Sequence, residues 1–329
     1  MTGSNQEPST TVAEGGAKPG PRPAISVVIC TRDRAESLRR TLGSLVEAGA
    51  ELAVPWELLV VDNGSSDHTP DVIQSFAGRL PVRRVDAPVA GLSNARNRAI
   101  EEARGDHILW TDDDVTVSRG WLSAYAAAFA SYPDVALFGG GTEPVLEEPA
   151  TPWFAAAQDA LEGLLAIRRV PEGGDMAPPY LPYGLNYAVR ADAQRRHRYD
   201  PRLGVAPGRR AGGEENRVML EIFEDGGTGR WVEKALVRHH IPAARQTEAY
   251  VEHFYRSNAI NPVWTYEQPA GLARLRRLWR EARVYRWFAR KARRARKAGD
   301  ARWVALYRDA MLSRGRLHVL LRGTDEYYG

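Results

Sequence analysis

Short runs rich in β-branched residues alternate with longer helical patterns along the first half of the chain, and this alternation limits the folds open to it. Strands are expected at 25–30, 57–61, 82–85, 108–111 and 135–138, and helices at 34–48, from about 69, at 93–104 and at 121–131. A crossover between parallel strands is right-handed and packs its helix back on the sheet. The order therefore predicts an α/β fold: a Rossmann-like, mainly parallel sheet with helices on both faces.

The composition limits where such a protein works. A chain of 329 residues can bury a large core without disulfides or a structural metal, and its one cysteine, Cys30, fits a reducing, cytoplasmic compartment. No run approaches the roughly 18 apolar residues that cross a bilayer, which argues against a membrane-embedded synthase. Residues 1–23 are rich in Gly, Ser, Thr and Pro and lack the apolar segment of a secretion signal, so we expect a disordered tail.

The charged residues are distributed unevenly. Residues 271–329 hold 17 basic and 5 acidic residues, whereas residues 1–270 hold 28 and 36. Apolar residues recur at helical spacing among the arginines of 271–297, so we expect 263–329 to form a basic helical extension. Four roles are open for it: peripheral contact with an anionic membrane or lipid-linked acceptor, docking on the acidic domain, self-association, or a solvated face. Nucleic acid is not expected, because no binding motif accompanies the basic residues.

Acidic residues follow three of the predicted strands. The run TRDR stands at 31–34, DNGSSD at 62–67 and DDD at 112–114. Sheets of this class bind ligands outside the carboxyl ends of their strands, so these runs are expected at one rim. Because clustered acids with little to neutralise them repel one another, a divalent cation is the expected partner. A DDD run in isolation is as often a solvated turn, but its place directly after a buried strand favours a site.

Two common nucleotide-binding motifs are missing from the sequence. No G-x-G-x-x-G follows the first strand, which argues against a nicotinamide or flavin enzyme, and no G-x-x-x-x-G-K-[ST] marks a P-loop phosphotransferase. The carboxylates of Asp112 and Asp114 can face the same way on an extended turn. Hard oxygen ligands suit Mg²⁺ or Mn²⁺, so the sequence predicts one of these metals as the phosphate neutraliser.

The helix predicted at 93–104 is expected to begin near the same rim. Ser93 is the expected N-cap, and Gly105 the glycine that ends the helix. Arg96 lies in the first turn, where an arginine beside a helix N-terminus suits a phosphate or a nucleobase edge. The alternative is an Arg96 that pairs with one of the aspartates.

Four runs of the sequence, in order and at the expected spacing, resemble the signature of the family-two glycosyltransferases of the GT-A fold. They are VVICTRDR at 27–34, LVVDNGSSD at 59–67, GLSNARN at 91–97 and ILWTDDD at 108–114. Each run alone is a weak signal, and together they are specific. The resemblance covers about residues 24–262, which it divides into a nucleotide-binding half, 24–141, and an acceptor and catalytic half, 142–262.

The resemblance implies roles for the residues of the first half. Thr31 and Asp62 correspond to residues that line the nucleobase pocket of a nucleoside-diphosphate sugar, usually with a pyrimidine base, and Arg32 belongs to the same donor site. Arg96 corresponds to a residue close to the base and diphosphate. Asp112 is implied as the ribose contact and Asp114 as the metal ligand. Asp113 is also placed in the donor site, because a run of three aspartates leaves the register of the two roles open.

Three segments of the second half also resemble the family. The run YGLNYAVR at 183–190, which contains Asn186, resembles a segment that ends in an arginine and borders the transferred sugar. GEEN at 213–216 resembles the element whose last acid is the catalytic base, which implies Glu215 and leaves Glu214 as a candidate. Helix capping by these glutamates is the competing role. HHIP at 239–242 implies His239 near the metal, with hydrogen-bonded packing as its alternative.

The sequence therefore predicts a metal-dependent, inverting glycosyltransferase that moves one sugar from a nucleoside-diphosphate sugar, with a UDP-linked or other pyrimidine-linked donor favoured, to a discrete acceptor. The acceptor classes left open are a natural product, a saccharide, a protein and a lipid-linked glycan. Processive polymerisation is disfavoured, because Gly227 replaces the glutamine of the Q-x-x-R-W motif. The alternatives are a sugar-phosphate nucleotidyltransferase, which lacks support because 31–34 contains no glycine, and a non-catalytic sugar-nucleotide or glycan binding module.

Overall fold

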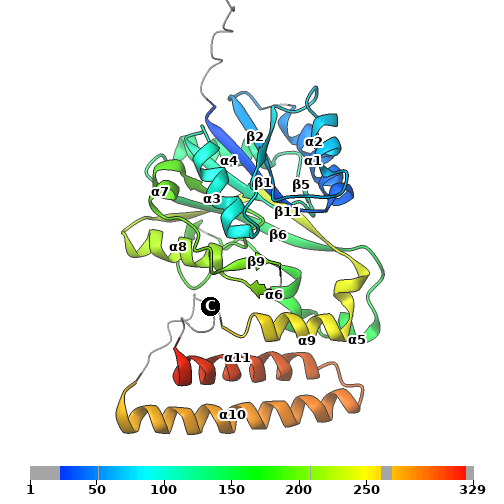
Figure 1. The fold of residues 1–329 in the computed structure, drawn as a ribbon, viewed down its shortest axis with the longest axis vertical. Coiled ribbons are helices and arrows are strands. Elements are labelled where there is room, and N and C mark those ends of the chain that lie inside the picture. The colour runs from blue at the N-terminus through cyan, green and yellow to red at the C-terminus, as the bar shows by residue number, and fades with distance from the viewer. Residues whose placement is uncertain (1–22, 51, 173, 208, 261–268, 324–329) are drawn as a thin grey trace, which may run out of the picture.

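A mixed β-sheet with helices on both faces forms the main body of the molecule, and a pair of long helices lies at one end (Figure 1). The computed structural model describes residues 23–50, 52–172, 174–207, 209–260 and 269–323. The strand order is β3-β2-β1-β4-β8-β6-β11-β5, and β7 pairs with β11 off this path. The strands of this sheet are β1 (Ile25–Thr31), β2 (Trp56–Asp62), β3 (Val82–Asp86), β4 (His107–Thr111), β5 (Val115–Val117), β6 (Leu137–Leu146), β7 (Asp175–Met176), β8 (Tyr187–Arg190) and β11 (Gly229–Ile241).

The prediction of a mainly parallel sheet holds for one half of it. Strands β3, β2, β1 and β4 are parallel neighbours, and each begins and ends within two residues of its predicted bounds. Beyond β4 the sheet is mixed: β8 is antiparallel to β4 and β6, β11 is parallel to β6, and β5 is antiparallel to β11. Short β5 follows directly after the aspartate run, with no helix that would carry the chain back for a parallel pairing.

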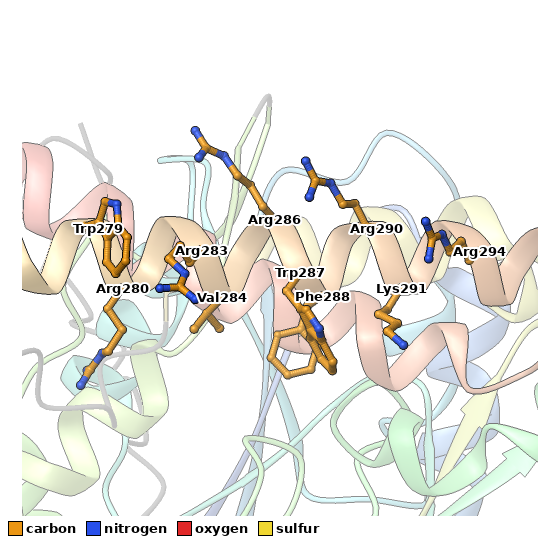
Figure 2. Close-up of a pocket in the computed structure, with 10 residues that line it drawn as sticks. All are labelled: Trp279, Arg280, Arg283, Val284, Arg286, Trp287, Phe288, Arg290, Lys291 and Arg294. Atoms are coloured by element: carbon orange, nitrogen blue, oxygen red, sulfur yellow. The ribbon is translucent and has the colours of Figure 1, made fainter.

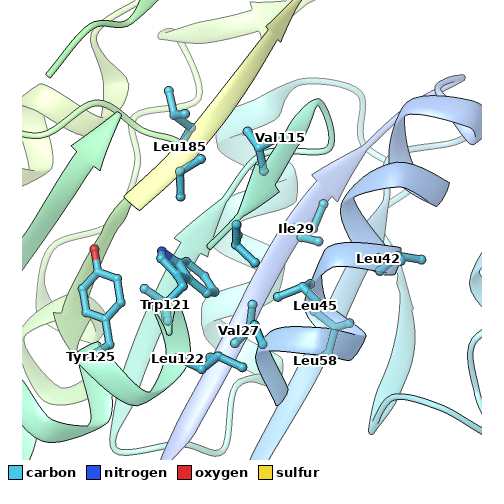
Figure 3. Packing of buried hydrophobic residues seen from close by; sticks show 14 of the residues in the cluster. Val27, Ile29, Leu42, Leu45, Leu58, Val115, Trp121, Leu122, Tyr125 and Leu185 are labelled. Atoms are coloured by element: carbon cyan, nitrogen blue, oxygen red, sulfur yellow. The ribbon is translucent and has the colours of Figure 1, made fainter. Parts of the chain in front are cut away.

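Two apolar clusters cover the two faces of the sheet, as the alternation of side chains along a strand requires. Helices α1 (Ala35–Gly49), α2 (Thr69–Ser75) and α4 (Trp121–Ser131) pack on the face that carries Val27 and Ile29. Figure 3 shows Leu42 and Leu45 of α1 beside these strands. Helices α3 (Leu92–Glu102) and α8 (Glu214–Glu224) pack on the opposite face, which carries Val28.

Helix α3 has different ends from those predicted. Its N-cap is Gly91, and Ser93 lies inside the helix, where its hydroxyl donates a 2.7 Å hydrogen bond to the carbonyl of Leu203. At the other end the helix stops at Glu102, before Gly105. Gly105 is needed for packing instead, because an added Cβ would lie 2.5 Å from the backbone nitrogen of Ser26 in β1.

A third cluster joins the main body to the C-terminal helices. The remaining elements are α5 (Pro152–Ala156), η1 (Gln158–Leu161), α6 (Glu162–Leu165), α7 (Ala191–Arg196), the hairpin β9 (Gly204–Ala206) and β10 (Arg209–Ala211), η2 (Ala243–Gln246), α9 (Glu248–Ser257), α10 (Gly271–Lys297) and α11 (Trp303–Arg322). Helix α10 has the predicted bounds. The predicted tail and the boundary between 262 and 263 lie outside the described residues. Among the helices that are described, none is long and apolar enough to cross a membrane.

Asn186, which the sequence placed in the donor site, lies in the core. Its side chain is fully buried, and its Oδ1 accepts hydrogen bonds from Trp121 Nε1 (2.8 Å) and Tyr125 OH (2.9 Å). Its Nδ2 donates to the carbonyls of Gly141 (2.7 Å) and Ala235 (2.9 Å). Every hydrogen-bonding position of the amide is therefore used inside the protein, and none is left for a sugar nucleotide.

Replacement of this amide should destabilise the fold. Asn186→Ala leaves two buried donors and two buried carbonyls without their partner, and we expect it to lower the free energy of unfolding by about 3 kcal/mol, measured by urea denaturation. Gln74→Ala, which removes an exposed amide from α2, is the control and should be near neutral. An Asn186→Ala protein that is as stable as the wild type but binds sugar nucleotides poorly would contradict this assignment.

Candidate active site

The rim of the sheet where β1, β2 and β4 end gathers the polar residues of the first half. Thr31 and Asp62 are direct partners in the β1–β2 register, so they lie side by side at the strand ends. Asp62 Oδ1 accepts a 2.8 Å hydrogen bond from the backbone of Ser65, and Oδ2 lies 3.0 Å from Arg84 Nη2. Arg32 points to solvent, with its Nε 3.6 Å from Asp33 Oδ2. The structure thus places Thr31 and Asp62 together, with Arg32 at the exposed margin.

Arginines neutralise the aspartate run, contrary to the expectation that these acids lack local partners. Asp113 accepts a 2.7 Å hydrogen bond from Thr31 Oγ1 and lies 3.2 Å from Arg34 Nε. Asp114 Oδ2 lies 2.8 Å from Arg34 Nη2 and 3.2 Å from Arg245 Nη2. Arg34 closes the predicted TRDR run, but Arg245 comes from η2, more than a hundred residues later in the chain.

The three aspartates have different acidities because their surroundings differ. Burial raises the pKa of Asp113 to about 7, although the charge of Arg34 opposes this change. Burial also acts on Asp114, but contact with His239 and the charges of Arg34 and Arg245 outweigh it and hold the pKa of Asp114 well below its usual range. Asp114 is therefore the fully ionised member of the run.

His239 reaches the aspartate run through the pairing of β11 with β5. Val115 and His239 are partners in this register, which brings His239 Nε2 to 3.6 Å from Asp114 Oδ2. His239 Nδ1 faces the carbonyl of Leu165 at 3.4 Å. The neighbouring His240 turns away and forms a 2.8 Å hydrogen bond with Thr116 Oγ1. Of the two histidines, His239 is the one at the site.

The fit of these residues to a divalent metal rests on one carboxylate and one imidazole. Mg²⁺ in enzymes is often held by one or two carboxylates together with substrate phosphates, and Asp114 matches the carboxylate of such a site, with His239 beside it. In this structure Arg34 and Arg245 contact the same carboxylate oxygen, and Arg245 Nη1 lies 3.2 Å from His239 Nε2. Within the described ranges no group of three or more His, Cys, Asp or Glu side chains is arranged to hold a metal by itself. A metal here therefore needs donor oxygens from the ligand.

A buried ion pair defines the other side of the site. Arg96 Nη1 lies 2.7 Å from Glu214 Oε1, and both side chains are about 5% exposed. The same atom lies 3.9 Å from Glu215 Oε2, whose side chain is 16% exposed. Arg96 therefore pairs with a glutamate, not with an aspartate as the alternative prediction held. Helix α8 begins after its N-cap Gly213, which has no side chain, and both glutamates lie in its first turn, where the predicted capping role stays a prediction.

Glu215 has a raised pKa. Burial and the negative charge of Glu214 raise the pKa of Glu215 to about 7, against the opposing charge of Arg96. Gly184, from the predicted run at 183–190, leaves room here: an added Cβ would lie 3.0 Å from Arg96 Nη2 and 3.5 Å from Glu215. A largely buried carboxylate with a pKa near neutrality suits proton transfer.

One aspartate links the two sides of the site. Burial and the charge of Asp114 raise the pKa of Asp112, and Arg96, His239 and Glu215 lie close enough to influence it as well. The aspartate run, the histidine and the glutamate pair therefore lie within electrostatic reach of one another. Arg190, which ends the run at 183–190, lies elsewhere: it pairs in register with His107 at the start of β4, at the opposite end of that strand from Asp112.

Three arginines at this site have roles that the sequence reasoning missed. Arg34 and Arg245 neutralise the aspartate run, and Arg84 pairs with Asp62. Arg34 had a local signal, because it directly follows the first strand in the predicted run. Arg84 lies on β3, two residues before the end of that strand. An alignment of β3 with β2 as parallel neighbours could have indicated its contact with Asp62. No local signal indicated Arg245, because its contact with Asp114 depends on the path of the chain after β11.

Comparisons with known proteins show what the chain resembles. The sequence profile described as Glycosyl transferase family 2 matches residues 26–151, which include the strand ends and the aspartate run. This segment of the chain therefore resembles the family-two glycosyltransferases.

Relatives and solved structures extend the likeness beyond that segment. The chain is 34% identical over 110 residues to validoxylamine A glucosyltransferase of Streptomyces hygroscopicus subsp. jinggangensis, covering 33% of this chain and 26% of that protein. It is 25% identical to the succinoglycan biosynthesis protein ExoM of Rhizobium meliloti, over 75% of this chain and 77% of that protein. The protein in the crystal structure of S. aureus TarS 1–349 in complex with UDP-GlcNAc is 16% identical to this chain. The structural match covers 71% of this chain and 64% of that one, with a TM-score of 0.51. This last likeness is one of fold, and the fold is GT-A.

The raised pKa of Glu215 can be measured directly. We expect the side-chain carboxyl ¹³C resonance of Glu215, assigned by its loss in Glu215→Gln, to titrate near pH 7. Glu214→Gln removes a neighbouring negative charge, which makes ionisation of Glu215 easier, so the midpoint should fall. Glu47→Gln, a change on α1, is the control and should leave the midpoint unchanged. A Glu215 midpoint in the ordinary range of an exposed glutamate would contradict the burial described here.

Proposed function

We propose that the protein is a metal-dependent, inverting glycosyltransferase that transfers one sugar from a nucleoside-diphosphate sugar, with a pyrimidine base, to a hydroxyl of a discrete acceptor. The observation that supports it is the convergence of the Asp114–His239 pair and the Arg96–Glu214–Glu215 cluster around Asp112. A cation site and a carboxylate base on either side of Asp112 would meet the needs of a transfer in which a diphosphate leaves as a hydroxyl attacks.

The nucleoside is assigned to the strand ends of the first half. Thr31 and Asp62 lie side by side there, and Asp62 is held in place by Arg84. In this proposal they face the base, Asp112 contacts the ribose, and Arg32 lies at the solvent margin. Asp113 serves mainly to fix the run, because its carboxylate is already used by Thr31 and Arg34.

The diphosphate is assigned to the space beside Asp114 and His239. These two residues would hold Mg²⁺ or Mn²⁺, which stabilises negative charge on a leaving diphosphate. Arg34 and Arg245 converge on the same carboxylate, so two permanent positive charges lie within reach of a phosphate that approaches it. This side of the site is therefore suited to a highly charged anion.

Glu215 is the proposed base, and Glu214 is a positioning residue. Glu214 is committed to the buried Arg96, whereas Glu215 lies farther from that guanidinium and is more exposed. Glu215 takes the proton of the acceptor hydroxyl while that oxygen attacks the anomeric carbon. The bond from the anomeric carbon to the diphosphate oxygen breaks in the same step, and attack from the face opposite the leaving group inverts the configuration.

Substitution of the two glutamates separates these roles. Glu215→Gln should keep UDP binding, measured by calorimetry, and slow the release of UDP from UDP-sugars about 10²- to 10⁴-fold, as loss of a general base does. In the wild type this rate should rise with pH up to about 7, because the pKa of Glu215 is raised and only its ionised form accepts a proton.

Glu214→Gln is the matched control, with a smaller effect on the rate and a loss of stability from the unpaired Arg96. If Glu214→Gln removes activity while the protein stays folded, and Glu215→Gln does not, the base is Glu214.

The proposed metal site makes a prediction that does not depend on turnover. Mn²⁺ together with UDP should raise the melting temperature of the wild type more than either does alone. The reason is that the diphosphate oxygens supply the metal ligands that the protein lacks, and the metal in turn binds the diphosphate. Asp114→Asn should lose this joint effect, and Asp71→Asn, on the exposed side of α2, should keep it. Equal UDP affinity with and without a chelator would count against the metal.

A further inference from the structure

Helix α10 lies at the outer edge of the molecule, where no other helix or strand of the described residues packs on one of its long faces. Helix α11 lies between α10 and α9 (Figure 1). The inner face of α10 packs on the third apolar cluster through Tyr285, Phe288 and Ala289. Glu281 is buried on the same side, 3.2 Å from Arg277 Nε. Contacts within the same chain therefore cover the inner face of α10.

The outer face of α10 combines positive charge with large apolar side chains. The helix carries twelve arginines and lysines, and its one acidic residue is the buried Glu281. Leu272, Leu275, Trp279 and Trp287 are 73%, 61%, 64% and 53% exposed. Large apolar side chains are rarely left in water at this level without a function, and four of them on one helix face form a stripe.

The arginines of this face point outward and lack acidic partners. Figure 2 shows Arg286, Arg290 and Arg294 extending to the same side of α10, at the spacing of successive helical turns. Arg283 lies over the ring of Trp279, 4.4 Å from its centre. Within the described part of the chain, none of these four arginines forms an ion pair with an acidic residue. The face is thus a band of uncompensated positive charge with indole rings inside it.

We propose that the outer face of α10 binds the surface of a lipid bilayer that contains anionic lipids, with the helix lying in the plane of the interface. Basic side chains attract anionic headgroups, and tryptophan prefers the boundary between headgroups and acyl chains. Leucine at this face gains by entering that boundary. A nucleic acid would satisfy the arginines but leave Leu272 and Leu275 in water, and a second copy would bring two positive faces together.

Vesicle co-sedimentation of the full chain tests this proposal. The wild type should bind vesicles of phosphatidylcholine mixed with phosphatidylglycerol, bind phosphatidylcholine alone weakly, and lose binding as salt rises. Replacement of Arg283, Arg286, Arg290 and Arg294 by glutamine should weaken the binding by about two to three orders of magnitude. Trp279→Ser with Trp287→Ser should weaken it while keeping the salt dependence.

The matched control removes the same charge from another surface. Arg196, Arg198, Arg202 and Arg217 are exposed and paired with acids on the main body, and their replacement by glutamine should leave vesicle binding unchanged. Equal binding of the wild type to both vesicle types, or equal losses in the two arginine variants, overturns the proposal. So does salt-sensitive binding of an oligonucleotide with no binding of vesicles. The salt series needs no substitution, so it decides the matter even where a variant unfolds.

Discussion

The buried pair of Arg96 and Glu214 is the contact on which the arrangement of the site depends. It joins α3, from the parallel half of the sheet, to the first turn of α8, 118 residues later in the chain. A charge pair that is removed from water must be well matched, because either partner alone would be a costly buried charge. The pair therefore fixes the start of α8, and with it the place of the next residue, Glu215, whose Oε2 lies 3.9 Å from the same guanidinium nitrogen.

Arginines from separate elements make the acidic rim stable in the absence of a ligand. Arg34 follows β1, Arg84 lies on β3 and Arg245 on η2, and each offsets an aspartate of the rim. The sequence predicted the acids at the strand ends because strand order and the position after a strand are local properties. Their partners depend on which segments meet in space, and for Arg245 on the whole course of β11.

The run at 183–190 shows how a correct segment can mislead about its residues. The segment does reach the site, but through Gly184, whose missing side chain leaves space beside Arg96 and Glu215. Asn186, two residues later, turns into the core, and Arg190 lies at the far end of β4. The chain turns at 184–186, where the backbone N–H of Asn186 donates a 3.0 Å hydrogen bond to the carbonyl of Tyr183. Membership of a motif therefore does not settle which of its residues faces the ligand.

The separation of charge along the chain gives the molecule a permanent electric dipole. Acidic residues outnumber basic ones in residues 1–270, 36 to 28, and the reverse holds in residues 271–329, with 17 basic and 5 acidic. In the field of a charged surface such a body feels a torque before it makes contact, so it arrives in a preferred orientation. At the proposed membrane surface, the long axis of α10 would set how the rest of the molecule stands, with the β-sheet body on the side away from the membrane.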